Sequence, residues 1–259
     1  MSAVSTLQKQ ACYSLNLVKL IKLFISFSAR CLVGCEKNKG TTVGMDTPKV
    51  TIWGTSTPRS FRPLWMAEEL GIHYKHKPIG PRTGETQTPE YRQLNRKQKI
   101  PFMQDGDVKL SESLAICRYL RDQYPSEQVL KPQDLVTKAK EDEWCCYIYG
   151  ELDETSLYVM RRHGDLGMIY GESETTVNAS RAYAEKHFEV VGQLLEKRPY
   201  LVGDQFGLAD LFLMSCIDWA NAYQVALPDS MHAYHAHIGE RPAYIRAMKL
   251  NYPALFGGN

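Results

Sequence analysis

The sequence predicts a small α/β domain followed by an all-helical domain. Strand-like and helix-like patterns alternate over residues 49–124, whereas only helical patterns occur from residue 138 onwards. The segment between them contains Pro125 and Pro132 among polar residues, which is typical of a linker. A length of 259 residues is enough for two domains of ordinary size. We expect an α/β domain over 48–126, a linker over 127–137 and a helical domain over 138–259.

The α/β half begins with a buried strand made of β-branched and aromatic residues, Val50 to Trp53. A polar loop follows and leads into a helix with apolar residues at helical spacing, for which Gly71 is the stop signal. Further on, Asp105-Gly106-Asp107 between two short apolar runs indicates a β-hairpin. The expected elements are strands at 49–53, 74–78, 100–103 and 108–110, and helices at 61–70, 89–96 and 114–124.

The second half shows the periodicity of amphipathic helices. Trp144, Ile148 and Leu152 recur every four residues and therefore predict one buried helix face. Longer stretches with the same kind of pattern predict further helices at 179–197, 208–223 and 242–250. We expect no strand in this half.

The first 44 residues differ in charge from the rest of the chain. They carry a net charge of +5, whereas the remaining 215 residues carry −3. Two lysines interrupt their apolar run at 15–27, so it does not resemble a transmembrane helix, which needs about 20 nearly uncharged residues. We interpret 1–47 as an N-terminal extension without a fold of its own, because Met45 precedes the first strand as a natural start would. The alternative is a mitochondrial presequence, since the segment is basic and almost free of acids.

Composition excludes several classes of function. The overall net charge of +2 gives no sign of a nucleic-acid partner. The seven cysteines are irregularly spaced and form no Cys-x-x-Cys motif, so neither a disulfide framework nor a zinc ribbon is expected. A reducing compartment, the cytoplasm, is the expected location, with the mitochondrion as the alternative if the N-terminal segment is a presequence.

Five short motifs occur in order along the chain: Thr-Pro-Arg-Ser-Phe-Arg at 57–62, Lys-Ile-Pro at 99–101, Leu-Ser-Glu-Ser at 110–113, Phe-Gly-Leu-Ala-Asp at 206–210 and Arg-Pro-Ala-Tyr at 241–244. Their order and spacing resemble those of cytosolic-type glutathione S-transferases, from Pro48 to the end of the chain. The resemblance implies a thioredoxin-like domain followed by an all-α helical bundle, the glutathione transferase fold. It also implies a homodimer that uses glutathione as co-substrate, with no metal and no membrane span.

The loop at 55–60 is the candidate site of thiol activation. A helix N-terminus carries about half a positive charge and stabilises an anion such as a thiolate, and a hydroxyl donor would lower the thiol pKa further. The resemblance, through a Ser/Thr-Pro-x-x-x-Lys/Arg pattern that ends at Arg62, places this donor on Thr57. Ser60 is the second candidate and Ser56 the third. The alternative interpretation is that these hydroxyls only cap the helix.

Two further motifs are the expected glutathione contacts. The resemblance implies that the Ile100-Pro101 bond is cis and that the Ile100 backbone pairs with the cysteinyl part of glutathione, as an added strand would. Lys99 is a candidate for the glycine carboxylate, although it is equally a solvated lysine. At the next motif, Ser113 can accept the γ-glutamyl carboxylate at a helix N-terminus, and Glu112 can pair with the γ-glutamyl ammonium. The structural alternatives are an ordinary strand-starting proline and a serine cap.

The helical half is expected to contribute stability and a second pocket. Asp210 is expected to close a capping box at the start of its helix even though Gly207 replaces the usual hydroxyl residue, with Phe206 and Leu211 as a hydrophobic staple. Cys145 and Cys146 are interpreted as packing residues. Candidates for the pocket of the second substrate are Tyr147, Tyr149, Tyr158, Met160 and Arg161, each of which could equally be a core residue.

The resemblance therefore predicts a glutathione S-transferase that holds the glutathione thiolate ready and adds it to a small electrophile or hydroperoxide. Two alternatives remain, because fold alone does not fix function. One is a non-catalytic binding or regulatory protein on the same fold. The other is a glutathione-dependent reductase or isomerase, and the absence of cysteine from the loop at 55–60 argues against the reductase.

Overall fold

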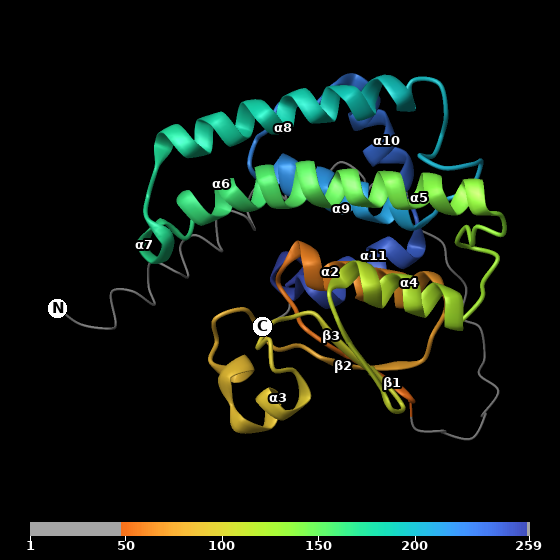
Figure 1. Cartoon of the computed structure of the whole chain (residues 1–259), viewed down its shortest axis with the longest axis vertical. Coiled ribbons are helices and arrows are strands. Elements are labelled where there is room, and N and C mark those ends of the chain that lie inside the picture. Colours follow the sequence, from red (N-terminus) through yellow and green to blue (C-terminus); the bar gives the residue numbers. More distant parts are fainter. Residues whose placement is uncertain (1–47, 258–259) are drawn as a thin grey trace.

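The computed structural model describes residues 48–257 and shows two domains that pack against each other (Figure 1). The extension expected over 1–47 lies outside the described residues. The first domain is α/β and the second is helical, as expected. None of the helices between residues 48 and 257 combines the length and the apolar character that a membrane span requires.

The α/β domain is built on a four-stranded mixed sheet with the strand order β2-β1-β3-β4. Its strands are β1 (Val50–Trp53), β2 (Tyr74–Lys77), β3 (Phe102–Asp105) and β4 (Val108–Ser111). β1 pairs with β2 in parallel and with β3 antiparallel, and β3 and β4 form the antiparallel hairpin predicted from the turn at Gly106. The third strand begins two residues later than expected, because the segment before Phe102 contains the Ile100-Pro101 bond.

Two helices of this domain, α2 (Pro58–Glu69) and α4 (Ser113–Gln123), lie between the sheet and the helical domain (Figure 1). The predicted stripe on α2 is buried, including Phe61, Leu64 and Trp65. The short helices η2 (Glu85–Gln87) and α3 (Pro89–Leu94) lie in the segment between β2 and β3, away from the domain interface.

The helical domain contains more elements than the periodicity predicts. Its first helix begins at Leu135, inside the expected linker, because Asp134 accepts a hydrogen bond from the Thr137 amide and caps it. A π-helical segment then interrupts the stripe formed by Trp144, Ile148 and Leu152. The elements are α5 (Leu135–Tyr147), η3 (Ile148–Leu157), α6 (Tyr158–His163), α7 (Gly167–Tyr170), α8 (Glu174–Leu195), α9 (Leu208–Ala222), α10 (Asp229–Gly239), α11 (Pro242–Asn251) and η4 (Pro253–Phe256).

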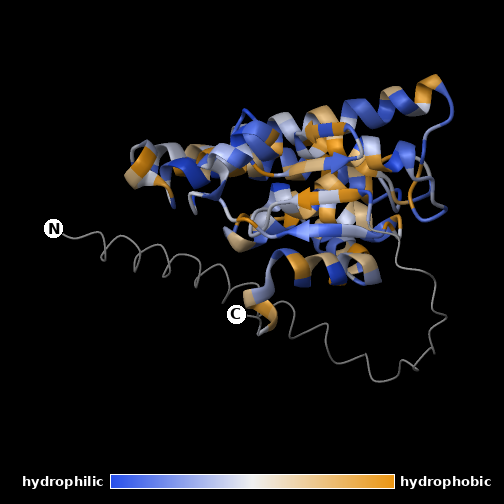
Figure 2. Ribbon diagram, turned by 90° about the horizontal axis from the view of Figure 1, so that it is seen from below, coloured by the Kyte–Doolittle hydropathy of each residue, from blue (hydrophilic) through white to orange (hydrophobic). Residues whose placement is uncertain are grey.

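Apolar side chains fill the interface between the domains as well as each interior. Hydrophobic residues gather in the middle of the molecule, while the outer faces of the helices are mostly hydrophilic (Figure 2). α9 is buried along nearly its whole length and packs on α2 and η3, and α11 returns to pack on α2. α11 therefore belongs to the domain interface. The described cysteines, Cys117, Cys145, Cys146 and Cys216, are all free thiols, and only Cys146 is exposed.

The predicted capping box at the start of α9 is confirmed. Asp210 is fully buried and its carboxylate accepts hydrogen bonds from the amides of Gly207 and Leu201, both at 2.9 Å. The Tyr234 hydroxyl donates a further bond at 2.8 Å. Asp210 therefore ties α10 and the preceding loop to the helix start, in addition to capping it.

Replacing Asp210 with alanine is expected to lower the free energy of unfolding by about 2–4 kcal/mol, because it leaves two buried amides and one buried hydroxyl without their hydrogen-bond acceptor. Chemical denaturation followed by circular dichroism would measure the loss. Asp229→Ala, which removes an exposed acid from the first turn of α10, is the matched control and should change stability by less than about 1 kcal/mol. A loss no larger than that of the control would refute this role of Asp210.

Candidate active site

Strand register brings the three predicted site segments together at one edge of the α/β domain. Trp53, at the end of β1, pairs with Phe102 at the start of β3, and Phe102 pairs in turn with Ser111 at the end of β4. The loop after β1, the Ile100-Pro101 segment before β3 and the Glu112-Ser113 segment after β4 therefore meet.

Gly54 allows the first two of these segments to approach closely. Its φ is +129°, and a Cβ at this position would lie 3.0 Å from the Ser60 Cβ and 3.2 Å from the Ile100 Cβ. Both distances are tighter than ordinary packing, so only glycine fits without a shift. The loop at 54–57 is thus pressed against Ile100-Pro101, whose peptide bond is cis as predicted.

Two of the three candidate hydroxyls, those of Thr57 and Ser60, form the cap of α2. The Thr57 hydroxyl accepts a hydrogen bond from the Ser60 amide at 3.0 Å, and the Ser60 hydroxyl accepts one from the Thr57 amide at 3.2 Å. The two hydroxyl oxygens are 2.8 Å apart, and both residues are buried. The capping interpretation is therefore confirmed for these two residues.

The third candidate, Ser56, is exposed. Its φ of 61° lies in the left-handed region, which is uncommon for a residue other than glycine and is often found at functional sites. The Ser56 amide donates to the backbone carbonyl of Asn251 at 2.9 Å, which holds the residue in this conformation. Of these three residues, Ser56 alone is exposed, and it lies directly before the cap of α2.

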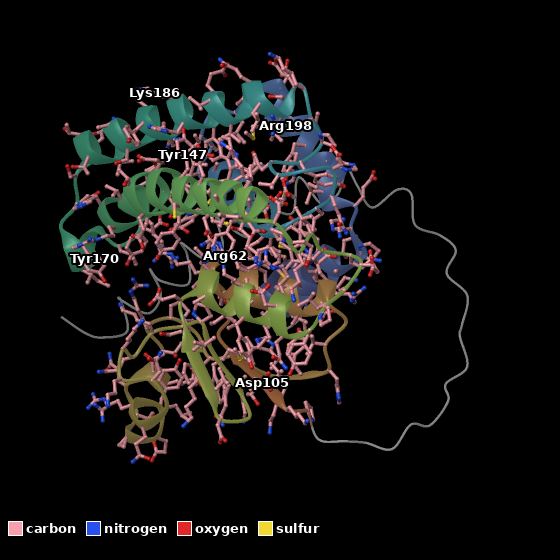
Figure 3. The ribbon with its side chains drawn as sticks, turned by 45° about the vertical axis from the view of Figure 1, so that its right-hand side comes forward. Arg62, Asp105, Tyr147, Tyr170, Lys186 and Arg198 are labelled. Carbon is pink, nitrogen blue, oxygen red and sulfur yellow. The ribbon has the colours of Figure 1, made fainter. Side chains whose placement is uncertain are left out.

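The segment before the cis bond is held by its own domain. The Lys99 carbonyl accepts hydrogen bonds from the Tyr91 hydroxyl at 2.8 Å and from the Asn95 amide group at 2.9 Å, while the Lys99 side chain extends into solvent. The side chains of Arg82 and Lys99 lie near Tyr170 of α7, labelled in Figure 3. A hydrogen bond from Arg82 and the positive charge of Lys99 lower the pKa of Tyr170. The mouth of the site beside Lys99 is therefore basic.

Glu112 and Ser113 stand at the N-terminus of α4. Ser113 is the first residue of the helix and is buried, whereas Glu112 is exposed and has a φ of 75°. The Glu112 carboxylate forms an exposed ion pair with Lys97 at 2.8 Å. Such an exposed pair contributes little stability, so Glu112 can exchange it for another cation.

A buried group of charges links the loop to the helical domain, and no local sequence pattern predicts it. Asp153, in η3, accepts a hydrogen bond from Arg59 at 3.1 Å and another from Arg62 at 2.5 Å. Arg62 and Asp153 are both fully buried, and Arg62 lies between the two domains (Figure 3). Arg62 also donates to the Ser215 hydroxyl at 2.7 Å and lies over the ring of Phe212, 4.4 Å from its centroid. The basic position predicted at the end of the loop motif thus anchors α2 to η3 and α9.

The two tyrosines expected in the second pocket point in different directions. The Tyr149 hydroxyl donates to Glu154, which pairs with Arg59 beside the loop. Burial raises the pKa of Tyr149 to about 12, and the nearby charge of Glu112 contributes to the rise. Tyr149 therefore faces the site. The Tyr147 hydroxyl lies 2.7 Å from His187 of α8, so this side chain packs between α5 and α8 (Figure 3).

The other pocket candidates divide in the same way. Tyr158 lies beneath the Arg59 guanidinium, 4.3 Å from it, and so belongs to the same cluster as Tyr149. Met160 is fully buried in the core. No three histidine, cysteine or acidic side chains are grouped closely enough to hold a metal ion among residues 48–257.

Comparison with known proteins agrees with this geometry. Residues 48–122 match the family model of the glutathione S-transferase N-terminal domain, and residues 147–242 match that of the C-terminal domain. A glutathione S-transferase of Triticum aestivum is 30% identical over 218 residues, which cover 81% of this chain and 97% of the wheat protein. The chain belongs to the glutathione S-transferase family. Since these relatives are glutathione S-transferases, the protein is an enzyme of the transferase class.

Solved structures of family members show the same fold. A theta-class glutathione S-transferase from Xanthomonas axonopodis pv. citri, solved with glutathione bound, has a TM-score of 0.67 and 28% identity. The match covers 78% of this chain and 97% of that protein. The glutathione transferase URE2P6 from Phanerochaete chrysosporium, in complex with oxidized glutathione, has a TM-score of 0.71 at 19% identity and supports the fold alone. The predicted thioredoxin-like and helical domains are confirmed.

Proposed function

We propose that this glutathione S-transferase activates the thiol of bound glutathione through the hydroxyl of Ser56. The observation that carries the proposal is the difference in burial among the three hydroxyl residues of the loop. Thr57 and Ser60 are buried in the cap of α2, whereas Ser56 is exposed beside the helix N-terminus. A hydroxyl donor and the partial positive charge of the helix end both favour a thiolate over a thiol. The order of candidates expected from the sequence, with Thr57 first and Ser56 third, is therefore reversed in this proposal.

Glutathione occupies the edge where the three segments meet. Its cysteinyl backbone pairs with Ile100 beside the cis bond at Pro101, and its γ-glutamyl carboxylate accepts hydrogen bonds at the start of α4 from Ser113. Glu112 exchanges Lys97 for the γ-glutamyl ammonium. Lys99, in the basic mouth of the site, pairs with the glycine carboxylate. The contacts at Ser113, Glu112 and Lys99 each match one charge of the tripeptide with an opposite charge or a helix N-terminus.

The thiolate then attacks a small electrophile or hydroperoxide held between the domains. Tyr149 and Tyr158 lie close to Arg59 and are the residues proposed to contact this substrate. Tyr147 contacts His187 of α8 and is left out of the proposal. The enzyme gains rate from the lowered thiol pKa and from holding the two reactants together, and no step requires a metal. The resemblance of the motifs supports a homodimer, and the irregular spacing of the cysteines supports a reducing compartment, the cytoplasm, as its location.

Titration of the bound thiol tests the proposal directly. The ultraviolet absorbance of the thiolate is followed against pH with enzyme in excess over glutathione, and conjugation of a chloronitrobenzene is assayed over the same range. The expected result is a bound-thiol pKa about one to two units below that of free glutathione, which corresponds to about 1.4–2.8 kcal/mol of preferential thiolate stabilisation. The pH profile of kcat should report the same pKa.

The two alternative functions give different outcomes in the same assay. A non-catalytic binding protein would bind glutathione with an unshifted thiol pKa and no conjugation. A reductase or isomerase would turn over a disulfide or an isomerisable substrate faster than electrophiles and hydroperoxides. Either result would contradict the proposal.

A further inference from the structure

Asn251, the last residue of α11, makes all of its side-chain hydrogen bonds to the loop at 55–60. It is fully buried, although it lies about 190 residues away in the sequence. Its amide nitrogen donates to the Thr57 carbonyl at 3.0 Å, and its amide oxygen accepts from the Ser60 hydroxyl at 2.9 Å. Its backbone carbonyl accepts from the Ser56 amide at 2.9 Å and from the Thr55 hydroxyl at 3.0 Å. The segment matched by the C-terminal family model ends at residue 242, so Asn251 lies beyond it.

These contacts determine where the protons of the loop hydroxyls point. The Thr57 carbonyl can only accept, so the group of Asn251 that faces it must be the NH₂ and the group that faces Ser60 must be the oxygen. Ser60 has one hydroxyl proton, and its acceptors are the Asn251 oxygen at 2.9 Å and the Thr57 carbonyl at 3.0 Å, both in the interior. The 2.8 Å contact between the two hydroxyls must then be a bond from Thr57 to Ser60. Both protons are committed to the interior, which leaves Ser56 as the free donor.

The backbone contact acts on Ser56 itself. A residue with a φ of 61° needs a partner that holds it there, and the bond from the Ser56 amide to the Asn251 carbonyl does so. The Asn251 side chain fixes the next residue through the Thr57 carbonyl. One residue of the helical domain therefore sets both the place and the identity of the donor in the other domain.

We infer that Asn251 is a positioning residue for thiol activation. It acts through Ser56, whose conformation it holds. This inference rests on the proposed function, because it assigns Asn251 a role in lowering the thiol pKa of bound glutathione. Asn251 does not touch the thiol. Asn251→Ala keeps the backbone bond to Ser56 but removes the side-chain bonds to the Thr57 carbonyl, next to Ser56, and to the Ser60 hydroxyl. Loss of the side chain should therefore affect kcat and the thiol pKa more than the KM for glutathione, whose contacts at Ile100, Glu112 and Ser113 are unchanged.

Three variants and their combination test this role. Asn251→Ala should raise the bound-thiol pKa by about one unit and lower kcat at neutral pH about tenfold, with KM for glutathione changed by less than about twofold. Asn251→Asp keeps an acceptor for Ser60 but places a carboxylate oxygen against the Thr57 carbonyl and adds a negative charge near the thiolate. The thiol pKa of glutathione bound to Asn251→Asp should therefore rise further than with Asn251→Ala. In the Ser56→Ala background, Asn251→Ala should add no further rise.

The control is Met248→Ala, one turn earlier on α11, which removes a side chain that is 4% exposed and makes no contact with the loop hydroxyls described above. It should lower the melting temperature and leave the thiol pKa at the wild-type value. Asn251→Ala with a lower melting temperature but a wild-type thiol pKa would overturn the inference, as would a full effect that persists in the Ser56→Ala background. A wild-type enzyme that does not lower the thiol pKa would instead refute the proposed function.

Discussion

Replacing Asp153 with alanine is expected to destabilise the protein by about 3–5 kcal/mol, because it leaves the buried Arg62 without its counter-ion and Arg59 without its main partner. Burial alone would raise the pKa of Asp153, but the two guanidinium groups outweigh it and hold this pKa below the usual range. The carboxylate is therefore ionised in the folded protein. Urea unfolding at neutral pH would measure the loss.

The pH dependence of the same variant provides a second test. A carboxyl whose pKa is lower in the folded state stabilises the protein above its unfolded pKa of about 4, and this contribution is lost as the pH falls through the folded value. The difference in stability between wild type and Asp153→Ala should therefore be largest near neutral pH and shrink below pH ~4. A difference that grows on acidification would contradict the ionised, paired state of Asp153.

Asp142→Ala is the matched control for charge. Asp142 pairs with Arg118 on the surface, where both side chains are more than a third exposed. Exposed pairs of this kind contribute about 0–1 kcal/mol, so the control should cost far less than the loss of Asp153. If both variants cost the same small amount, the buried pair would not hold the domains together.

Much of the edge that carries the proposed glutathione contacts, and the cap of α9, could be predicted because they are local motifs. The cis bond at Pro101, the start of α4 at Ser113 and the cap at Asp210 each depend on a few neighbouring residues, and the structure contains all of these features. Sheet register then brings the first two together without any further information. Some observed element boundaries differ from the predicted ones by a few residues. For example, the cap at Asp134 starts a helix inside the expected linker.

The contacts between domains could not be predicted, because nothing near Asp153 or Asn251 in the sequence signals their partners. Asp153 lies beside Leu152 in an amphipathic pattern, and only the π-helical segment and the packing of the domains bring it to Arg62. Asn251 reaches the loop because α11 folds back onto α2. Our proposal of Ser56 in place of Thr57 depends on these contacts, which the loop motif alone does not contain.

Ser56→Ala is expected to give the largest loss of activity of any single change in the loop. Loss of this donor should raise the bound-thiol pKa by up to about the one to two units by which the wild-type site is expected to lower it. The thiolate fraction near neutral pH, and kcat/KM with it, should then fall by as much as about 10–100-fold. Raising the pH should recover part of the activity, because the thiolate then forms without help.

Three companion variants make the result specific to the Ser56 hydroxyl. Ser56→Gly also lacks the hydroxyl but relieves the left-handed φ of 61°, so it should lose activity like alanine while remaining at least as stable as wild type. Thr57→Ala removes a helix cap and should cost about 0.5–2 kcal/mol of stability with a smaller change in the thiol pKa. Ser173→Ala removes the cap of the distant helix α8 and controls for the loss of a cap alone. If Thr57→Ala raised the thiol pKa and Ser56→Ala did not, Thr57 would be the donor. The Thr57 hydroxyl would then have to point its proton toward the thiol. The bond from the Ser60 hydroxyl to Asn251 opposes this, because it leaves the Ser60 oxygen as the acceptor of the Thr57 proton.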